Sequence, residues 1–106
     1  MKSARADAVA AAWPIAEAEL DALRLLSYDE LLAKPNLVTV EIPEKGLRVT
    51  LTTYVDVLTN HDSAIQVVAQ LIAHGGFSSN FHCRGFRLSR DGACRELVEN
   101  ELWEYM

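Results

Sequence analysis

The chain has 106 residues, of which 50% are hydrophobic, and its formal net charge at pH 7 is −5. This composition is typical of a single globular domain over residues 1–106 and excludes a disordered or repeat-built chain. No stretch approaches the roughly 20 apolar residues that cross a bilayer, so we expect no membrane partner. The acidic balance repels phosphate backbones, so we expect no nucleic-acid partner either. Acidic residues and a proline interrupt the only run that resembles a signal peptide, which favours a cytoplasmic protein.

The N-terminal third of the chain predicts helix. Residues 3–34 are rich in Ala, Leu and Glu and contain no Gly. Because proline is favoured in the first turn of a helix and disfavoured in its interior, Pro14 predicts a main helix over 14–26 and a lead-in over 1–12 that frays. Apolar residues fill most of the circumference of the main helix, so we expect it to be buried on more than one side.

A second, shorter helix follows. Ser27 and Glu30 have the spacing of a capping box, in which each residue bonds to the backbone of the other. The box predicts a helix over 28–34. Pro35 ends it, because the residue before a proline avoids the helical conformation.

The middle of the chain changes to a period of two. Hydrophobic side chains alternate over 37–42 and again over 47–57, and residues 43–46 have the composition of a turn. This pattern predicts a β-hairpin with a long second strand.

Residues 62–74 fit two structures. As a helix, the segment would have Asp62 as its cap and Gly75 as its stop. As a strand, it would carry alternating apolar and polar residues. Its β-branched side chains favour the strand.

The last part of the chain predicts another hairpin and a terminal helix. Asp91 and Gly92 favour a two-residue turn. That turn sets a register supported by charge and apolar pairing, with Arg87 opposite Glu96, Arg84 opposite Glu99 and Phe86 opposite Leu97. Asn100 is the expected cap of a short helix over 101–106. The predicted fold is therefore α+β, with N-terminal helices on one face of a four- to five-stranded antiparallel sheet and a short C-terminal helix.

Metal, cofactor and disulfide chemistry are not expected. The candidate zinc ligands are His74, His82, Cys83 and Cys94, and their spacing matches none of the usual zinc motifs. Neighbouring residues on a strand point to opposite faces, so His82 and Cys83 neither chelate one ion nor form a nucleophile–base pair. In the predicted hairpin the two cysteines lie roughly 20 Å apart, which is too far for a disulfide.

An enzyme would need its acid and base elsewhere. The side chains able to take these roles in a pocket between helix and sheet are Glu19, Tyr54, Asp56 and His74. No catalytic motif links them, so we favour a protein without catalytic residues.

Aromatic residues late in the chain are the candidate binding residues. They are Phe77, Phe81, Trp103 and Tyr105. Interfaces are enriched in aromatic side chains, and Trp103 and Tyr105 do not both face inward from one short helix without strain. The alternative is that these rings form a satellite core against the sheet.

Three functional hypotheses follow. The leading one is a non-catalytic module that binds a protein or a small ligand and acts as a homodimer, because an open sheet has edges that a second copy could cover. The second is an acidic inhibitor or immunity-type protein for a basic enzyme. The third is a small enzyme with a pocket between helix and sheet.

Overall fold

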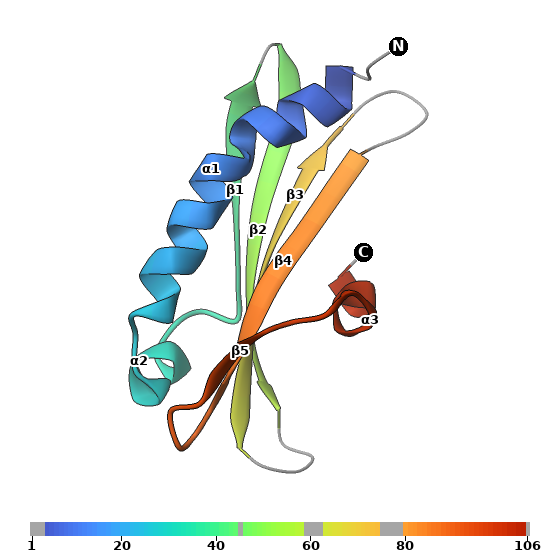
Figure 1. The fold of residues 1–106 in the computed structure, drawn as a ribbon. Helices are drawn as coiled ribbons and strands as arrows, with labels where there is room; N and C mark the ends of the chain where they lie inside the picture. The colour runs from blue at the N-terminus through green and yellow to red at the C-terminus, as the bar shows by residue number, and fades with distance from the viewer. Residues whose placement is uncertain (1–3, 45, 59–62, 75–79, 106) are drawn as a thin grey trace.

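The computed structural model describes residues 4–44, 46–58, 63–74 and 80–105. It has the predicted α+β architecture, in which a long helix packs on a five-stranded antiparallel sheet (Figure 1). The elements are α1 (Ala4–Arg24), α2 (Tyr28–Leu32), β1 (Leu37–Glu44), β2 (Leu47–Leu58), β3 (Ala64–Ala73), β4 (Asn80–Ser89), β5 (Cys94–Glu96), α3 (Glu99–Leu102) and the 3-10 turn η1 (Trp103–Tyr105).

The sheet is a meander in the order β1-β2-β3-β4-β5. The predicted first hairpin is confirmed, with Leu37 opposite Tyr54 and Glu44 opposite Leu47. The strand interpretation of 62–74 is confirmed over 64–73, and the helix alternative is wrong there. Nearly every β3 side chain is buried, because β3 is the central strand and both of its faces are covered. This explains why β-branched residues occur at both odd and even positions of β3.

Helix α1 runs unbroken through Pro14, so the predicted division into a lead-in and a main helix is wrong. Pro14 removes the bond to the carbonyl of Ala10, which costs about 3 kcal/mol in a helix interior. Both residues lie on the exposed side of α1. On the opposite side the buried stripe continues across the proline, with Val9 before it and Leu20 after it. Each such apolar side chain contributes roughly 1.5–3 kcal/mol when fully buried, which offsets the lost bond.

The short helix α2 begins as predicted. The Ser27 hydroxyl accepts a hydrogen bond from the Glu30 N–H (3.2 Å), and the Glu30 carboxylate accepts one from the Ser27 N–H (2.9 Å). The hydrogen bond from the Ser27 backbone is the main cause that lowers the pKa of the Glu30 carboxyl. The helix ends at Leu32, shortly before Pro35.

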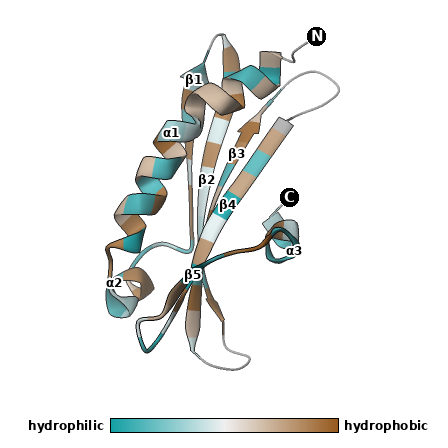
Figure 2. Cartoon of the chain, viewed as in Figure 1, coloured by the Kyte–Doolittle hydropathy of each residue, from teal (hydrophilic) through white to brown (hydrophobic). Residues whose placement is uncertain are grey.

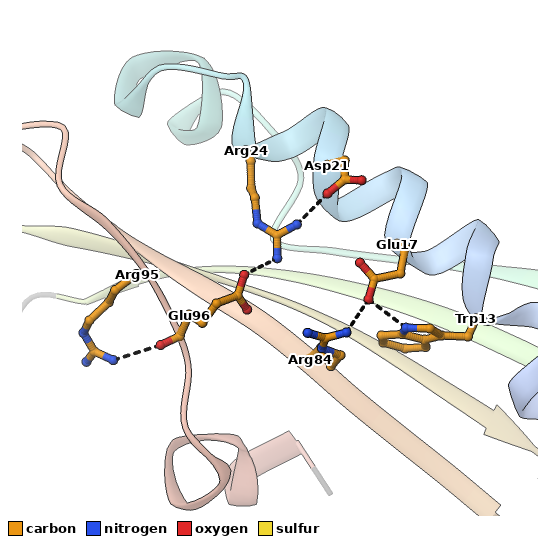
Figure 3. Close-up of polar contacts among 7 residues, drawn as sticks. All are labelled: Trp13, Glu17, Asp21, Arg24, Arg84, Arg95 and Glu96. Carbon is orange, nitrogen blue, oxygen red and sulfur yellow. Dashed lines mark hydrogen bonds and ion pairs between the residues drawn. The ribbon is translucent and has the colours of Figure 1, made fainter.

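One flank of α1 is tied to β4 and β5 by ion pairs (Figure 3). Glu17 lies 2.6 Å from Arg84, and Arg24 lies 2.5 Å from Glu96. The Arg24 guanidinium also lies 5.4 Å from the centre of the Phe86 ring. These contacts place α1 over the β3–β4 side of the sheet.

The predicted register of the last hairpin is wrong by one residue. Arg87 lies opposite Arg95, and Phe86 lies opposite Glu96. The turn is longer than expected: Ser89 N–H bonds to the Ala93 carbonyl (2.8 Å), which leaves a three-residue loop, 90–92. Gly92 takes the left-handed conformation (φ 97°) that such a loop requires at its last position. The shift moves Glu96 onto the face covered by α1, where it meets Arg24.

The C-terminal helix also differs from the prediction, because it starts earlier. α3 begins at Glu99, and the Glu101 carboxylate, rather than an Asn100 side chain, accepts from the backbone N–H that precedes the helix, that of Val98 (3.0 Å). Glu101 also lies 2.7 Å from Arg95 and 3.0 Å from Arg87. One carboxylate therefore neutralises two arginines that stand directly opposite each other on neighbouring strands.

The face of the sheet away from α1 carries a second apolar cluster. Its buried members are Val68, Cys83, Leu97, Leu102 and Tyr105. The segment after β5 thus folds back over β3 and β4, on the side opposite α1 (Figure 1).

We predict that Glu101→Gln lowers the free energy of unfolding by about 1 kcal/mol at neutral pH, because it leaves Arg87 facing Arg95 without a counter-charge. Hydrogen bonds from Arg95, followed by that from the Val98 N–H, lower the pKa of the Glu101 carboxyl to about 2. In the unfolded chain this pKa returns to about 4.3. The stabilisation is therefore complete above about pH 4.5 and is lost as the pH falls toward 2.

Urea unfolding at several pH values tests this prediction. The difference between the wild type and Glu101→Gln should shrink as the pH approaches 3. Glu99→Gln is the matched control, because Glu99 makes no ion pair with any described residue. A difference that does not depend on pH would contradict the ion-pair explanation.

Candidate functional site

Half of the outer edge of β4 has no neighbouring strand among the described residues. β5 pairs only with Phe86–Leu88, and the last bond on this side joins the Leu97 N–H to the Gly85 carbonyl (3.0 Å). Backbone groups alternate in direction along an antiparallel strand. Since Gly85 points outward, Cys83 and Phe81 point outward as well. In the upper half of β4 in Figure 1, these outward N–H and C=O groups therefore have no neighbouring strand among the described residues.

An apolar hollow lies beside this edge on the α1 side. It has a volume of about 420 Å³ and is lined by Ala6, Val9, Ala10, Trp13, Phe81 and His82. The Trp13 and His82 rings meet edge to face with their centres 4.5 Å apart. Phe81 is 47% exposed, although it is a large hydrophobic residue.

A second hollow lies on the other side of the same edge. It has a volume of about 480 Å³ and is lined by Phe81, His82, Cys83, Arg84, Leu97, Glu99 and Leu102. The two hollows share Phe81 and His82, so they flank the same part of the unpaired strand. We call the two hollows together with residues 81–84 the β4-edge groove.

The polar groups that border the groove are held in place. The Glu17 carboxylate accepts hydrogen bonds from Trp13 Nε1 (2.7 Å) and from Arg84 (2.6 Å), as Figure 3 shows. Burial, with a smaller contribution from the positive charge of Arg84, lowers the pKa of His82 against the opposing effect of Glu17. The lowered pKa favours the neutral form of the His82 ring.

The wall formed by α3 is anchored through Tyr105. Its hydroxyl donates to the Asp56 carboxylate and accepts from Gln66 Nε2 (3.1 Å). Its backbone carbonyl accepts from Gln70 Nε2 and from Cys83 Sγ (3.3 Å). Burial, followed by the bond to Asp56, raises the pKa of the Tyr105 hydroxyl, so it stays a proton donor. These bonds fix the C-terminal segment against the sheet.

The four aromatic residues expected to bind a partner do not form one surface. Phe81 lies in the β4-edge groove, whereas Trp103 is 69% exposed and lines neither hollow. Tyr105 is buried, so only one of the two C-terminal aromatics faces inward. Phe77 lies outside the described residues.

Sequence reasoning missed the contribution of α1 to the groove. Ala6, Val9, Ala10 and Trp13 recur at the i, i+3, i+4, i+7 spacing of one helix face. That signal was present in the sequence. It was overlooked because this segment was interpreted as a frayed lead-in.

The acid and base candidates do not come together. Glu19 is exposed on α1. Tyr54 donates to Gln70 (3.4 Å), Asp56 is bonded to Tyr105, and His74 Nε2 lies 3.0 Å from the Thr50 hydroxyl. None of the hydrogen bonds of these residues joins two of them.

The residues that could form a thiol nucleophile or hold a metal are also separated. His82 lies on the α1 face against Trp13, while the Cys83 thiol donates to the Tyr105 carbonyl on the other face. Cys83 and Cys94 are both free thiols. No cluster of three or more potential ligands for a metal occurs in the described part of the chain. What the described groups have in common is a strand edge along β4 that is unpaired among the described residues and has a hollow on each side.

Comparison with known proteins finds no family model that matches the chain, and no curated protein or solved structure similar to it. Within residues 4–44, 46–58, 63–74 and 80–105, none of the helices has the length and apolar character needed to span a membrane.

We predict that the two thiols differ strongly in reactivity. Burial raises the pKa of the Cys83 thiol to about 11, whereas Cys94 is exposed. At pH 8 the thiolate fraction of Cys83 is therefore about a hundredfold below that of an ordinary cysteine. Titration with an aromatic disulfide reagent should show one fast thiol in the native protein and two after unfolding.

The variant Cys94→Ser is the control for this assignment. It should remove the fast phase and leave the slow thiol unchanged. Two fast thiols in the native wild type would show that the C-terminal segment does not cover Cys83.

Proposed function

We propose that the protein is a non-catalytic binding module that acts as a homodimer and takes up an extended segment of a partner protein along β4. The observation that carries the proposal is the unpaired outer edge of residues 81–84, which has an apolar hollow on each side. A free strand edge binds an extended chain through main-chain hydrogen bonds, and flanking pockets select its side chains.

The geometry sets the chemistry of the bound segment. Its backbone would bond to the outward N–H and C=O groups of Phe81 and Cys83. Its successive side chains would point alternately to the two faces of the sheet. One side chain would therefore enter the hollow beside Val9 and Trp13, and the next would enter the hollow beside Leu102. A short run of consecutive apolar residues fits both hollows.

The net charge of −5 favours a basic protein as the source of this segment. Complementary charge accelerates such encounters and makes them sensitive to salt. An inhibitor or immunity-type protein that covers a basic enzyme is therefore the second candidate function. Association that does not weaken with ionic strength would speak against it.

Selection from a library of displayed random peptides tests the proposed function. Selected peptides should share consecutive apolar residues and should change the fluorescence of Trp13, measured in the Trp103→Phe background. N-methylation of every second peptide nitrogen should weaken binding about tenfold for each hydrogen bond lost, and N-methylation of the nitrogens between them should have little effect. Equal tolerance at all positions would overturn strand addition.

Two variants at one position separate the backbone from the side chain. Phe81→Pro removes an outward N–H that β3 does not use, so it should abolish peptide binding and leave the sheet intact. Phe81→Ala keeps this N–H and should retain part of the affinity. Thr39→Pro on the opposite edge is the matched control and should bind as the wild type does. Unchanged binding by Phe81→Pro would contradict the proposal.

A further inference from the structure

The other edge of the sheet, β1, is also unpaired among the described residues. β1 pairs only with β2, and the Val55 N–H bonds to the Asn36 carbonyl (2.9 Å) in the same register. Because backbone groups alternate in direction along an antiparallel strand, and those of Asn36 point toward β2, the N–H and C=O groups of Leu37, Thr39 and Glu41 point outward. Pro43 occupies the next outward position, so its missing N–H does not remove a hydrogen bond between β1 and β2.

This edge carries apolar side chains that the protein itself leaves uncovered. Leu37, Val38 and Val40 are 54%, 43% and 47% exposed. Long apolar edges aggregate unless another chain or element covers them.

Helix α1 also has an uncovered apolar stripe. Ala11, Ile15, Ala18 and Ala22, with Leu25 just after the helix, are all exposed and follow a seven-residue repeat. At about 100° per residue, this stripe lies away from both the buried side of α1 and the flank that contacts β4 through Trp13, Glu17 and Arg24. The expectation that the main helix is buried on more than one side is therefore not met within one chain.

We propose that a second copy of this chain covers β1, with the two β1 strands antiparallel and the two-fold axis at Thr39. This inference rests on the homodimer of the proposed function and names its surface. Leu37 then pairs with the partner's Glu41, Thr39 with the partner's Thr39, and Glu41 with the partner's Leu37. Every outward backbone group of these residues gains a partner, with two hydrogen bonds for each pair.

The side chains agree with this register. Val38 stands opposite the partner's Val40 on the face of the sheet that carries α1, and β-branched residues pair well across strands. Lys34 lies in the turn before β1 and Glu44 is the last residue of β1, so each end of the paired segment brings a lysine of one copy toward the glutamate of the other. Both residues belong to the same chain, so this complementarity favours a second copy over an unrelated strand.

Two prolines single out Thr39 as the centre. Pro35 and Pro43 lie at equal distances from it, so each faces the partner's copy of the other just beyond the paired segment. An axis at Val38 would place Pro35 within the ladder opposite the partner's Glu41. An axis at Val40 would place Pro43 opposite the partner's Leu37. Either shift leaves the outward carbonyl of the facing residue without a donor, because proline has no N–H.

The resulting dimer has a continuous ten-stranded sheet with both α1 helices on one face. The β4-edge groove of each copy lies at the far edge and stays accessible. One dimer therefore presents two copies of the groove.

Cysteine cross-linking tests the register directly. In the Cys94→Ser background, Thr39→Cys places two thiols at the axis, where Cα atoms of a bonded pair are about 5.5 Å apart and a disulfide forms. Glu41→Cys is the matched control on the same face, and its two copies would lie roughly 13 Å apart. We expect a covalent dimer from Thr39→Cys and none from Glu41→Cys. Equal cross-linking of both variants would overturn the register.

Native mass spectrometry and sedimentation test the surface itself. The wild type and Phe81→Pro should be dimers, and Thr39→Pro should be a monomer. If Thr39→Pro does not fold, Val38→Lys and Val40→Glu replace it: each alone should weaken the dimer at least tenfold, and the double variant should restore it because the new charges face each other. A monomeric wild type at high micromolar concentration, or a dimer insensitive to these charges, would overturn the proposal.

The two proposals fail separately. A monomer that still binds the selected peptides would leave the β4-edge groove intact and remove the homodimer together with its β1 interface. A dimer cross-linked at position 39 that binds no peptide would remove only the groove.

Discussion

One long helix lies over a five-stranded sheet, and its position decides which apolar surfaces stay uncovered. Glu17 and Arg24 pair with Arg84 and Glu96, which holds α1 on the β3–β4 side. The hydropathy colouring in Figure 2 shows hydrophilic and hydrophobic bands alternating along this helix, yet only one apolar side meets the sheet. The strands far from β4 are left with exposed valines. The ion pairs contribute little energy in exposed positions, but they select one placement among several that hydrophobic burial alone would allow.

The sequence predicted those features that depend on neighbouring residues. Three of these signals are local: the alternation over 37–57, the capping box of Ser27 and Glu30, and the β-branched composition of β3. Each of the corresponding elements forms where its pattern predicts it. Pro14 led to a wrong prediction because the hydrogen bond it removes is local, whereas the burial that offsets this loss is tertiary. The small and apolar side chains before and after Pro14 pack into the same core. Local propensity carries no information about that core.

The last hairpin also shows that patterns within neighbouring strands do not determine contacts with a third element. Its predicted register looked favourable because it paired unlike charges across two strands. In the structure Arg87 faces Arg95, an unfavourable pair by itself, and Glu101 from the following helix neutralises both. Glu96 meanwhile reaches Arg24, far away in the sequence. A pairing rule restricted to two strands cannot anticipate a third element that supplies the counter-charge. The groove was only partly predictable for the same reason, because Phe81 and Trp13 become neighbours only after α1 has docked.

The two sheet edges that are unpaired among the described residues differ in a way that underlies the different partners proposed for them. Residues 81–84 of β4 lie between walls supplied by α1 and by the segment that ends at Tyr105, so an incoming strand meets a shaped site. Such a site selects side chains and suits a foreign segment. The hollow beside β1 lies at one end of the strand, against Glu41, Ile42 and Pro43, whereas the prolines, charges and valines of β1 are arranged symmetrically about Thr39. Symmetry of this kind has no use in binding an unrelated chain, whereas it satisfies every group at once in a two-fold interface. The meander topology keeps the edges apart, so occupation of one does not obstruct the other.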